Sequence, residues 1–225
     1  MNASRHYDEG YHGEVHANLI SNEVYYRAVA QASQAFYLSP GEAALRILDY
    51  GCGLGQFIYG LKNAAGFEIS GEARRHCKGR GLHVWGRLGD VPAGQWDIVI
   101  VRHVLEHLEA PAEALRAMRQ LLAPSGTLII VLPREGHGAA SYEPDVHRHL
   151  YCWNFRNLNN LLYVAGYQPY VNKYRYLRGF GVLLPLYRWG LHGLYRIAVQ
   201  ASGWLVRNAE LYVRARARED AEPDG

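Results

Sequence analysis

Residues 47–57 read Ile-Leu-Asp-Tyr-Gly-Cys-Gly-Leu-Gly-Gln-Phe, and this stretch decides the fold. The residues up to the first glycine are mostly apolar with little alternation, which is typical of a parallel strand covered on both faces. Gly51, Gly53 and Gly55 then follow at alternate positions. Glycine allows positive φ angles and a close approach of backbone to ligand, and a following helix presents free amides. The stretch therefore predicts a buried strand, a ligand-binding turn and a helix.

Composition limits the class of protein. The chain has 225 residues, a formal net charge of +3 and 49% hydrophobic residues, which is enough for a substantial core. This charge is too small to indicate nucleic-acid binding. Cys52, Cys77 and Cys152 are widely spaced and odd in number, which favours reduced thiols in the cytoplasm. The first residues lack the apolar stretch of a signal peptide.

Strands that alternate with helices are predicted along most of the chain. Helices are expected at residues 17–38, 57–65, 72–78, 105–122 and 155–165. After the first strand, further strands are expected at residues 67–70, 82–85, 97–101, 127–132, 167–176 and 210–218. Such alternation favours a parallel sheet with right-handed crossovers.

A different pattern occupies residues 179–207, which contain cations but no acids. Arginines interrupt every apolar run well below the ~18 residues that a membrane span requires, so this segment is not expected to cross a bilayer. Two alternatives stay open. The segment lies on a membrane surface as a peripheral contact, or it packs as a helical pair on the domain or on a second subunit of a homodimer.

The glycine pattern departs from the dinucleotide fingerprint Gly-x-Gly-x-x-Gly because position 56 is Gln. Asp-x-Gly-x-Gly-x-Gly at residues 49–55 instead resembles the first motif of class I S-adenosylmethionine (SAM) dependent methyltransferases. The strand at 97–101, His-Val-Leu-Glu-His-Leu-Glu-Ala-Pro at 103–111 and Leu-Leu-Ala-Pro-Ser-Gly-Thr-Leu at 121–128 resemble the fourth and fifth motifs. Arg-His-Leu-Tyr at 148–151 resembles a loop of enzymes that modify glycans, lipids or secondary metabolites.

The resemblance implies a Rossmann-like α/β fold. Its seven-stranded sheet would be mostly parallel, with helices on both faces and an antiparallel last strand. Residues 1–40 would then form an N-terminal cap segment and helix, and residues 41–218 the SAM-binding methyltransferase domain. Residues 177–208 would be a helical insertion between strands six and seven, and residues 219–225 a polar tail.

The resemblance also implies a cofactor site, in which the amides of the glycine turn receive the methionine part of SAM and Asp49 lies near its ammonium group. The expected contacts at the carboxyl ends of the strands are Asp49, Gly51, Cys52, Gly53, Gly55, Leu88, Asp90, Arg102 and His103. Relatives commonly have Asp after the third strand to accept the adenine amino group, but Arg87 stands there and cannot accept a hydrogen bond. Asp90, or the backbone near Leu88, is the alternative.

An acid after the second strand should accept both ribose hydroxyls, because a carboxylate offers two acceptor oxygens. Glu72 and Glu68 are the candidates. Glu72 is favoured, since its separation from the glycine motif is closer to the ~20 residues expected for a ribose-binding acid. The alternatives are a helix-start carboxylate for Glu72 and an exposed strand residue for Glu68.

His149 is the first candidate for a general base and His147 the second. The loop after the fifth strand lies at the carboxyl edge of the sheet, where ligands bind in open α/β folds, and imidazole can take an alcohol or phenol proton. Hydrogen bonding to the loop backbone is the alternative role. His103, Glu106 and His107 match an inverted zinc-protease motif formally, but their position after a strand leads us to expect no metal. A divalent ion, as in some quinone-modifying relatives, is the alternative.

The favoured function is therefore transfer of a methyl group from SAM to a small-molecule acceptor, at an oxygen atom of a glycan-, lipid- or secondary-metabolite-type substrate. The alternative is a catalytically silent subunit that binds a protein partner or a membrane surface through residues 177–208. A nicotinamide oxidoreductase is disfavoured by Gln56. We expect a cytoplasmic protein, with peripheral membrane contact left open.

Overall fold

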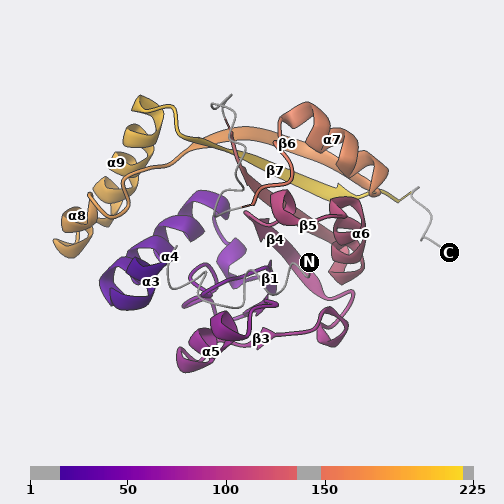
Figure 1. Ribbon diagram of the computed structural model, residues 1–225, viewed down its shortest axis with the longest axis horizontal. Coiled ribbons are helices and arrows are strands. Elements are labelled where there is room, and N and C mark those ends of the chain that lie inside the picture. Colours follow the sequence, from indigo (N-terminus) through magenta and orange to yellow (C-terminus); the bar gives the residue numbers. More distant parts are fainter. Residues whose placement is uncertain (1–15, 136–147, 220–225) are drawn as a thin grey trace.

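The computed structural model describes residues 16–135 and 148–219. Within these ranges a seven-stranded sheet has the order β3-β2-β1-β4-β5-β7-β6 (Figure 1). The strands are β1 Ile47–Tyr50, β2 Ala64–Phe67, β3 Val84–Trp85, β4 Trp96–Arg102, β5 Leu122–Pro133, β6 Tyr167–Tyr176 and β7 Ala209–Ala217. β7 is antiparallel to both of its neighbours, and the pairs from β3 to β5 are parallel. The predicted Rossmann-like α/β fold, mostly parallel with an antiparallel last strand, is confirmed.

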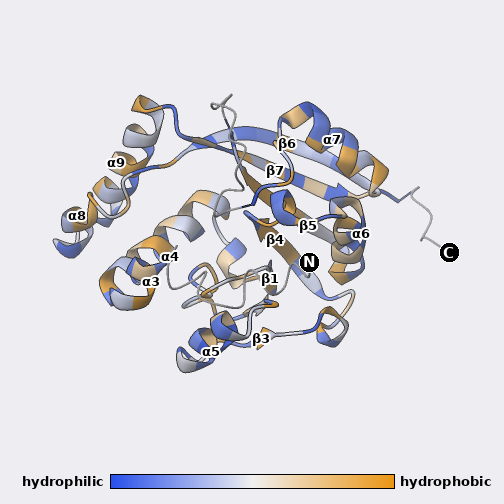
Figure 2. Ribbon diagram, in the orientation of Figure 1, coloured by the Kyte–Doolittle hydropathy of each residue, from blue (hydrophilic) through white to orange (hydrophobic). Residues whose placement is uncertain are grey.

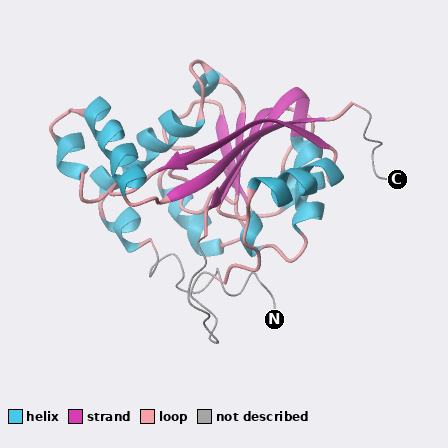
Figure 3. Cartoon of the chain, turned by 90° about the horizontal axis from the view of Figure 1, so that it is seen from above, coloured by secondary structure: helices cyan, strands magenta, loops and turns pink. Residues whose placement is uncertain are grey.

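Helices cover both faces of the sheet, as expected (Figure 3). They are α3 Ala17–Ser21, α4 Glu23–Tyr37, α5 Gly71–Gly79, α6 Pro111–Leu121, α7 Phe155–Val164, α8 Leu184–Arg188 and α9 His192–Leu205. Short 3-10 turns are η1 Glu42–Ala44, η2 Leu88–Asp90 and η3 Leu105–His107. Among the described residues, none of the helices combines the length and the apolar character that crossing a bilayer demands.

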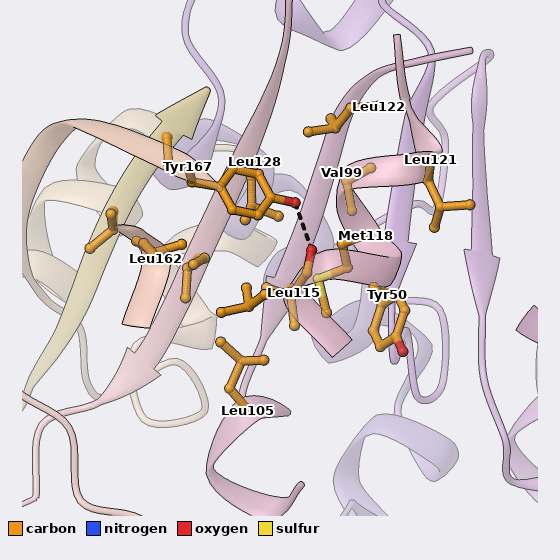
Figure 4. Close-up of a cluster of buried hydrophobic side chains, with 14 of the residues drawn as sticks. Tyr50, Val99, Leu105, Leu115, Met118, Leu121, Leu122, Leu128, Leu162 and Tyr167 are labelled. Atoms are coloured by element: carbon orange, nitrogen blue, oxygen red, sulfur yellow. Dashed lines mark hydrogen bonds between the residues drawn. The ribbon is translucent and has the colours of Figure 1, made fainter. Parts of the chain in front are cut away.

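Each face of the sheet has its own core because the side chains of a strand alternate between the faces. In β4, Val99 and Val101 face α6 and α7, whereas Ile98 and Ile100 face α4, α8 and α9. Figure 4 shows the first core, where the buried Tyr167 hydroxyl donates to the Leu115 carbonyl oxygen at 2.9 Å. Figure 2 shows that the central strands are apolar along most of their length. The continuous apolar runs of the sequence thus fill both cores.

Two of the helix predictions need correction. The helix expected at residues 17–38 is two helices, because Asn22 caps α4 by accepting a hydrogen bond from the Tyr25 amide at 3.0 Å. The helix expected at residues 57–65 is wrong, since the chain passes through turns and reaches β2 at Ala64. Pairing between β1 and β2 begins at Ile47 and Ala64, which leaves little chain for a helix.

The segment between β6 and β7 is helical, as predicted. It forms α8 and α9, joined by a turn at Gly190, which has φ +77°. Both helices lie at one end of the long strands β6 and β7, beside α3 and α4 (Figure 1). The Tyr187 hydroxyl of α8 donates to Gln31 of α4 at 2.9 Å. The insertion therefore packs on the same face of the sheet as the N-terminal helices.

Candidate functional site

The glycine turn lies at the carboxyl end of β1, where the sheet order changes direction between β1 and β4. Ligands of open α/β folds bind at such a switch point. Gly51, Gly53 and Gly55 have φ angles of +74°, +53° and +75°, a region that favours glycine. A Cβ on Gly51 would lie 2.5 Å from Cγ2 of Val104. Conformation and space therefore both require glycine at position 51.

Four amides of the turn already donate hydrogen bonds within the protein. Gly51 and Cys52 donate to the Phe67 carbonyl oxygen at 2.8 and 3.1 Å, and Gly55 donates to Cys52 at 2.9 Å. Gly53 donates to Oε2 of Glu68 at 2.8 Å. These bonds fix the shape of the turn and tie β1 to the end of β2. Contact of these amides with a methionine carboxylate stays a prediction.

Asp49 is the last acid before the turn, and its side chain is fully buried. Its Oδ2 accepts a hydrogen bond from Nη2 of Arg102 at 3.2 Å, while Oδ1 has no hydrogen-bond partner among the described residues. Burial raises the pKa of Asp49, and the guanidinium of Arg102 acts against this shift. Because a buried carboxylate oxygen without a partner is costly, the site suits a ligand that donates hydrogen bonds or carries positive charge.

Arg102 ends β4 beside this carboxylate. Its guanidinium lies over the Phe57 ring, 4.7 Å from the ring centroid. Such a contact orients a cation on an aromatic face. The sequence-predicted residues Asp49 and Arg102 are therefore brought together in one buried pair at the switch point.

Glu68 follows β2 directly, and its side chain is buried against the glycine turn. Oε2 accepts from the Gly53 amide and Oε1 from the Ser70 amide, both at 2.8 Å. Glu72 instead lies in the first turn of α5, which Ser70 caps. A carboxylate there interacts favourably with the helix dipole. Glu68 is thus the acid that the fold holds on the glycine turn.

Leu88 and Asp90 both lie in η2, after β3. Leu88 is partly buried against the core that contains α6, whereas Asp90 is exposed. Arg87 is the residue before η2 and is exposed. The assignment of this region to the adenine stays a prediction.

His103 follows β4 with φ +52°, an uncommon angle for a residue other than glycine. Its Nε2 lies 3.1 Å from Oε1 of Glu210, and its Nδ1 lies 3.6 Å from Oε1 of Glu106. Burial lowers the pKa of His103, but the carboxylates of Glu106 and Glu210 more than offset this and raise it to about 10. The imidazole is therefore held in its charged form between two acids.

The sequence analysis missed two residues near His103, namely Glu210 and Tyr37. Glu210 is the second residue of the last strand, β7, and its Oε2 accepts a hydrogen bond from the Tyr37 hydroxyl at 2.5 Å. Burial raises the pKa of Glu210, yet His103 and Tyr37 lower it overall. These residues lie far from His103 in the chain, so no local spacing connects them. The sequence signal for Glu210 was an acidic residue at the start of the strand expected at residues 210–218.

His149 lies between β5 and α7, and its Nδ1 contacts Oε1 of Glu135. Oε2 of the same carboxylate accepts from the Cys152 thiol at 2.8 Å, and this bond raises the pKa of Cys152. The rings of His149 and His107 pack edge to face with centroids 4.8 Å apart. His147 lies outside the described residues.

Glu106, His107 and His149 bring one candidate ligand atom each to within 4.8 Å of one another. Glu106 is fully buried, and neither of its carboxylate oxygens accepts a hydrogen bond from the described part of the chain. Carboxylate and imidazole donors suit several divalent cations. The expectation that the protein uses no metal stays a prediction.

Comparisons with known proteins identify the family that this chain resembles. Residues 22–170 match a family model described as a methyltransferase domain. Ubiquinone biosynthesis O-methyltransferase of Methylococcus capsulatus is 33% identical over 100 residues, which cover 38% of this chain and 42% of the relative. The enzyme of the same name from a Caulobacter species is 32% identical over 101 residues, or 38% and 40% of the two chains. The chain thus spans about two fifths of these relatives' length.

Among solved structures, a possible histamine N-methyltransferase of Thermotoga maritima superposes with a TM-score of 0.62 and 18% identity, covering 95% of this chain and 99% of that one. Magnesium protoporphyrin IX methyltransferase of Synechocystis, solved with bound SAM, gives a TM-score of 0.60 and 15% identity, with coverages of 97% and 98%. At these identities the likeness concerns the fold.

Proposed function

This chain belongs to the class I SAM-dependent methyltransferases, and we propose that it transfers a methyl group to an oxygen atom of a small-molecule acceptor. The family match extends over residues 22–170, well over half of the chain, and confirms the predicted enzyme class together with its cofactor. Oxygen as the acceptor atom is supported by the relatives named ubiquinone biosynthesis O-methyltransferases. A glycan-, lipid- or secondary-metabolite-type acceptor is the substrate class that we propose.

The observation that carries the proposal is the buried Oδ1 of Asp49, which has no hydrogen-bond partner among the described residues and lies beside a turn whose three glycines have positive φ angles. In the proposal Asp49 accepts from the ammonium group of the cofactor. Glu68, fixed by two backbone amides, uses its remaining lone pairs for the ribose hydroxyls. Glu72 is the alternative ribose ligand. Cys52, Leu88, Asp90 and His103 line the rest of the pocket in this proposal.

When bound, SAM would supply an electrophilic methyl group for in-line transfer to the acceptor oxygen, with the thioether S-adenosylhomocysteine as the leaving group. The acceptor hydroxyl must lose its proton, and His149 is the proposed general base, with His147 second. Glu135 contacts Nδ1 of His149. A carboxylate at that nitrogen orients the ring and stabilises the imidazolium that forms when Nε2 takes the proton.

The cofactor assignment is tested by calorimetry of SAM binding to the wild type and to Asp49→Asn, Glu68→Gln and Glu72→Gln. We expect binding to weaken by about tenfold or more in the first two variants, since each loses a charged hydrogen-bond acceptor. Glu72→Gln is the matched control and should bind within about twofold of the wild type. A wild-type protein that binds no SAM would contradict the proposal, and a greater loss in Glu72→Gln would move the ribose contact to Glu72.

The base is tested with His149→Gln in a transfer assay from labelled SAM to a panel of hydroxylated acceptors. We expect kcat to fall by about 10²-fold or more, in the range typical of general base catalysis, while SAM affinity stays unchanged. His83→Gln changes an exposed histidine before β3 and should keep full activity. Unchanged kcat in His149→Gln would mean that positioning of the acceptor suffices without this base.

A catalytically silent SAM-fold subunit is the second candidate. It is favoured by the internal bonding of four turn amides and by the turns that stand in place of the helix expected at residues 57–65. Tight SAM binding without methylated product across the acceptor panel would support this candidate and contradict catalysis.

A further inference from the structure

Helix α9 is apolar on two opposite faces. Tyr195, Val199 and Gly203 are buried against the domain. Leu194, Ile197, Trp204 and Leu205 are 49%, 64%, 68% and 76% exposed. Their separations of three, seven and one residues place these four side chains along one side of the helix. We call this set the α9 stripe, and it has no apolar cover in the described part of the molecule.

The α9 stripe is rigidly held. A Cβ on Gly203 would lie 2.3 Å from the amide nitrogen of Leu177, so helix and strand backbones touch here. The Arg178 amide donates to Val199 at 3.2 Å, and the Ser202 hydroxyl donates to Arg178 at 2.6 Å. The helix cannot roll to bury its outer face without breaking these contacts. Large apolar side chains fixed outward in this way mark an interaction surface.

The charged residues of the insertion are all of one sign. Residues 177–208 contain no acid, and their arginines are Arg178, Arg188, Arg196 and Arg207. Arg178, Arg188 and Arg207 are exposed. Trp189, in the turn between α8 and α9, is 73% exposed. Tryptophan and arginine together with an apolar stripe are the composition of helices that lie in a membrane interface.

A hollow of about 480 Å³ opens at the end of α9. Its lining is Arg134, Tyr176, Trp204, Leu205 and Arg207. Two guanidinium groups thus stand beside two members of the α9 stripe. This pairing of cations with apolar side chains suits an anionic lipid, with its headgroup on the guanidinium groups and its acyl chain along the α9 stripe. Arg134 directly follows β5, so the hollow reaches the carboxyl edge of the sheet.

We propose that the α9 stripe lies in the interface of an anionic lipid bilayer, with Arg134, Arg207 and the other exposed arginines of the insertion on its headgroups. A second copy of the chain fits less well, because a symmetric pairing through this surface would set the arginines of one copy against those of the other. The proposal is independent of the methyl-transfer reaction.

The test is flotation of the full chain with vesicles of phosphatidylcholine alone and of an equal mixture of phosphatidylcholine and phosphatidylglycerol. We expect partitioning onto the mixed vesicles to be about tenfold stronger or more, and to fall when salt rises from about 0.15 M to about 1 M. Ile197→Gln combined with Trp204→Gln should lower partitioning by about tenfold or more. Val164→Gln on α7 is the matched control, because Val164 and Ile197 are both 64% exposed.

Circular dichroism melts must show that the variants stay folded, which is expected for exposed positions. A folded wild-type protein that does not bind the anionic vesicles overturns the proposal. A wild-type dimer that the double variant loses, without vesicle binding, also overturns it and makes the stripe a subunit interface. SAM calorimetry separates the outcomes, since a chain that binds SAM but no vesicles leaves the methyl-transfer proposal intact.

Discussion

The glycine turn of residues 51–55 and the α8–α9 insertion both depend on a glycine, but for different physical reasons. Gly51 has φ +74°, and a Cβ there would meet side-chain atoms of Val104. Gly203 lies inside α9, and a Cβ there would meet backbone atoms of Tyr176 and Leu177. Gly51 is needed for its positive φ angle, whereas Gly203 is needed because the backbones of α9 and of residues 176–177 lie too close for a Cβ. The insertion is therefore built into the domain at backbone contact and is no loose appendage.

The largest expected effect is on the insertion. Gly203→Ala should lower the free energy of unfolding by about 3 kcal/mol, because the added methyl group meets main chain that cannot move cheaply. Gly193→Ala on the same helix meets nothing within 4 Å and should stabilise by about 0.5 kcal/mol. Urea denaturation of both variants measures the difference. Equal stabilities would show that α9 is only loosely docked.

A smaller loss is expected in the turn. Gly51→Ala should cost about 2 kcal/mol, since the positive φ is unfavourable for alanine and the Cβ presses on Val104. Gly60→Ala has a similar φ of +81° with open space around it and should cost about 1 kcal/mol. The same denaturation experiment gives both values. If Gly51→Ala and Gly60→Ala lower the free energy of unfolding equally, the Val104 side chain moves aside at little cost. The positive φ angle alone then requires glycine at position 51.

The two regions should also differ in their response to pH, because the insertion lacks acids whereas His103 lies between Glu106 and Glu210. The pKa of His103 is raised in the folded state to about 10, from about 6.5 in an unfolded chain. Its stabilising contribution is therefore complete below pH 6.5 and is lost as pH rises toward 10. The Tm difference between wild type and His103→Asn should shrink over that interval. A difference that grows with pH would contradict the assignment.

The smallest effect is expected from metal removal. We expect chelation by EDTA to leave SAM binding and methyl transfer unchanged, because the site residues that we propose act without a metal. Activity that disappears on chelation and returns with Mg²⁺ or Zn²⁺ would contradict this. It would then place an ion among Glu106, His107 and His149, whose candidate ligand atoms lie within 4.8 Å of one another.

Much of the fold could be predicted because the central strands are long apolar runs bounded by turn signals. The error at residues 57–65 has a physical cause. Phe57, Ile58 and Leu61 recur at helical spacing, and Ala64–Phe67 has weak intrinsic strand preference. Pairing with both β1 and β3 overrides that preference. Gly66, which resembled a helix end, is needed because a Cβ there would lie 2.4 Å from the Cys52 sulfur.

The position of β2 also bears on the choice between the two candidate acids. Once β2 ends at Phe67, Glu68 becomes the residue that follows the second strand, and Glu72 becomes a residue of α5. The positions of Asp49, Arg102 and the glycines could be predicted because the first two lie in well-marked strands and the glycines directly follow one. Glu135 and Glu210 could not, because no local spacing in the sequence connects them with their partners His149 and His103.

β7 is the last strand in the sequence, yet it lies between β5 and β6. During synthesis on the ribosome, β6 therefore emerges before β7, the strand that joins it to the sheet. The backbone groups on the inner edge of β6 stay unpaired until β7 is made. Glu210 and Tyr212, which contact Tyr37 from this late strand, arrive at the same moment. The native surroundings of His103 therefore cannot form before β7 has been synthesised.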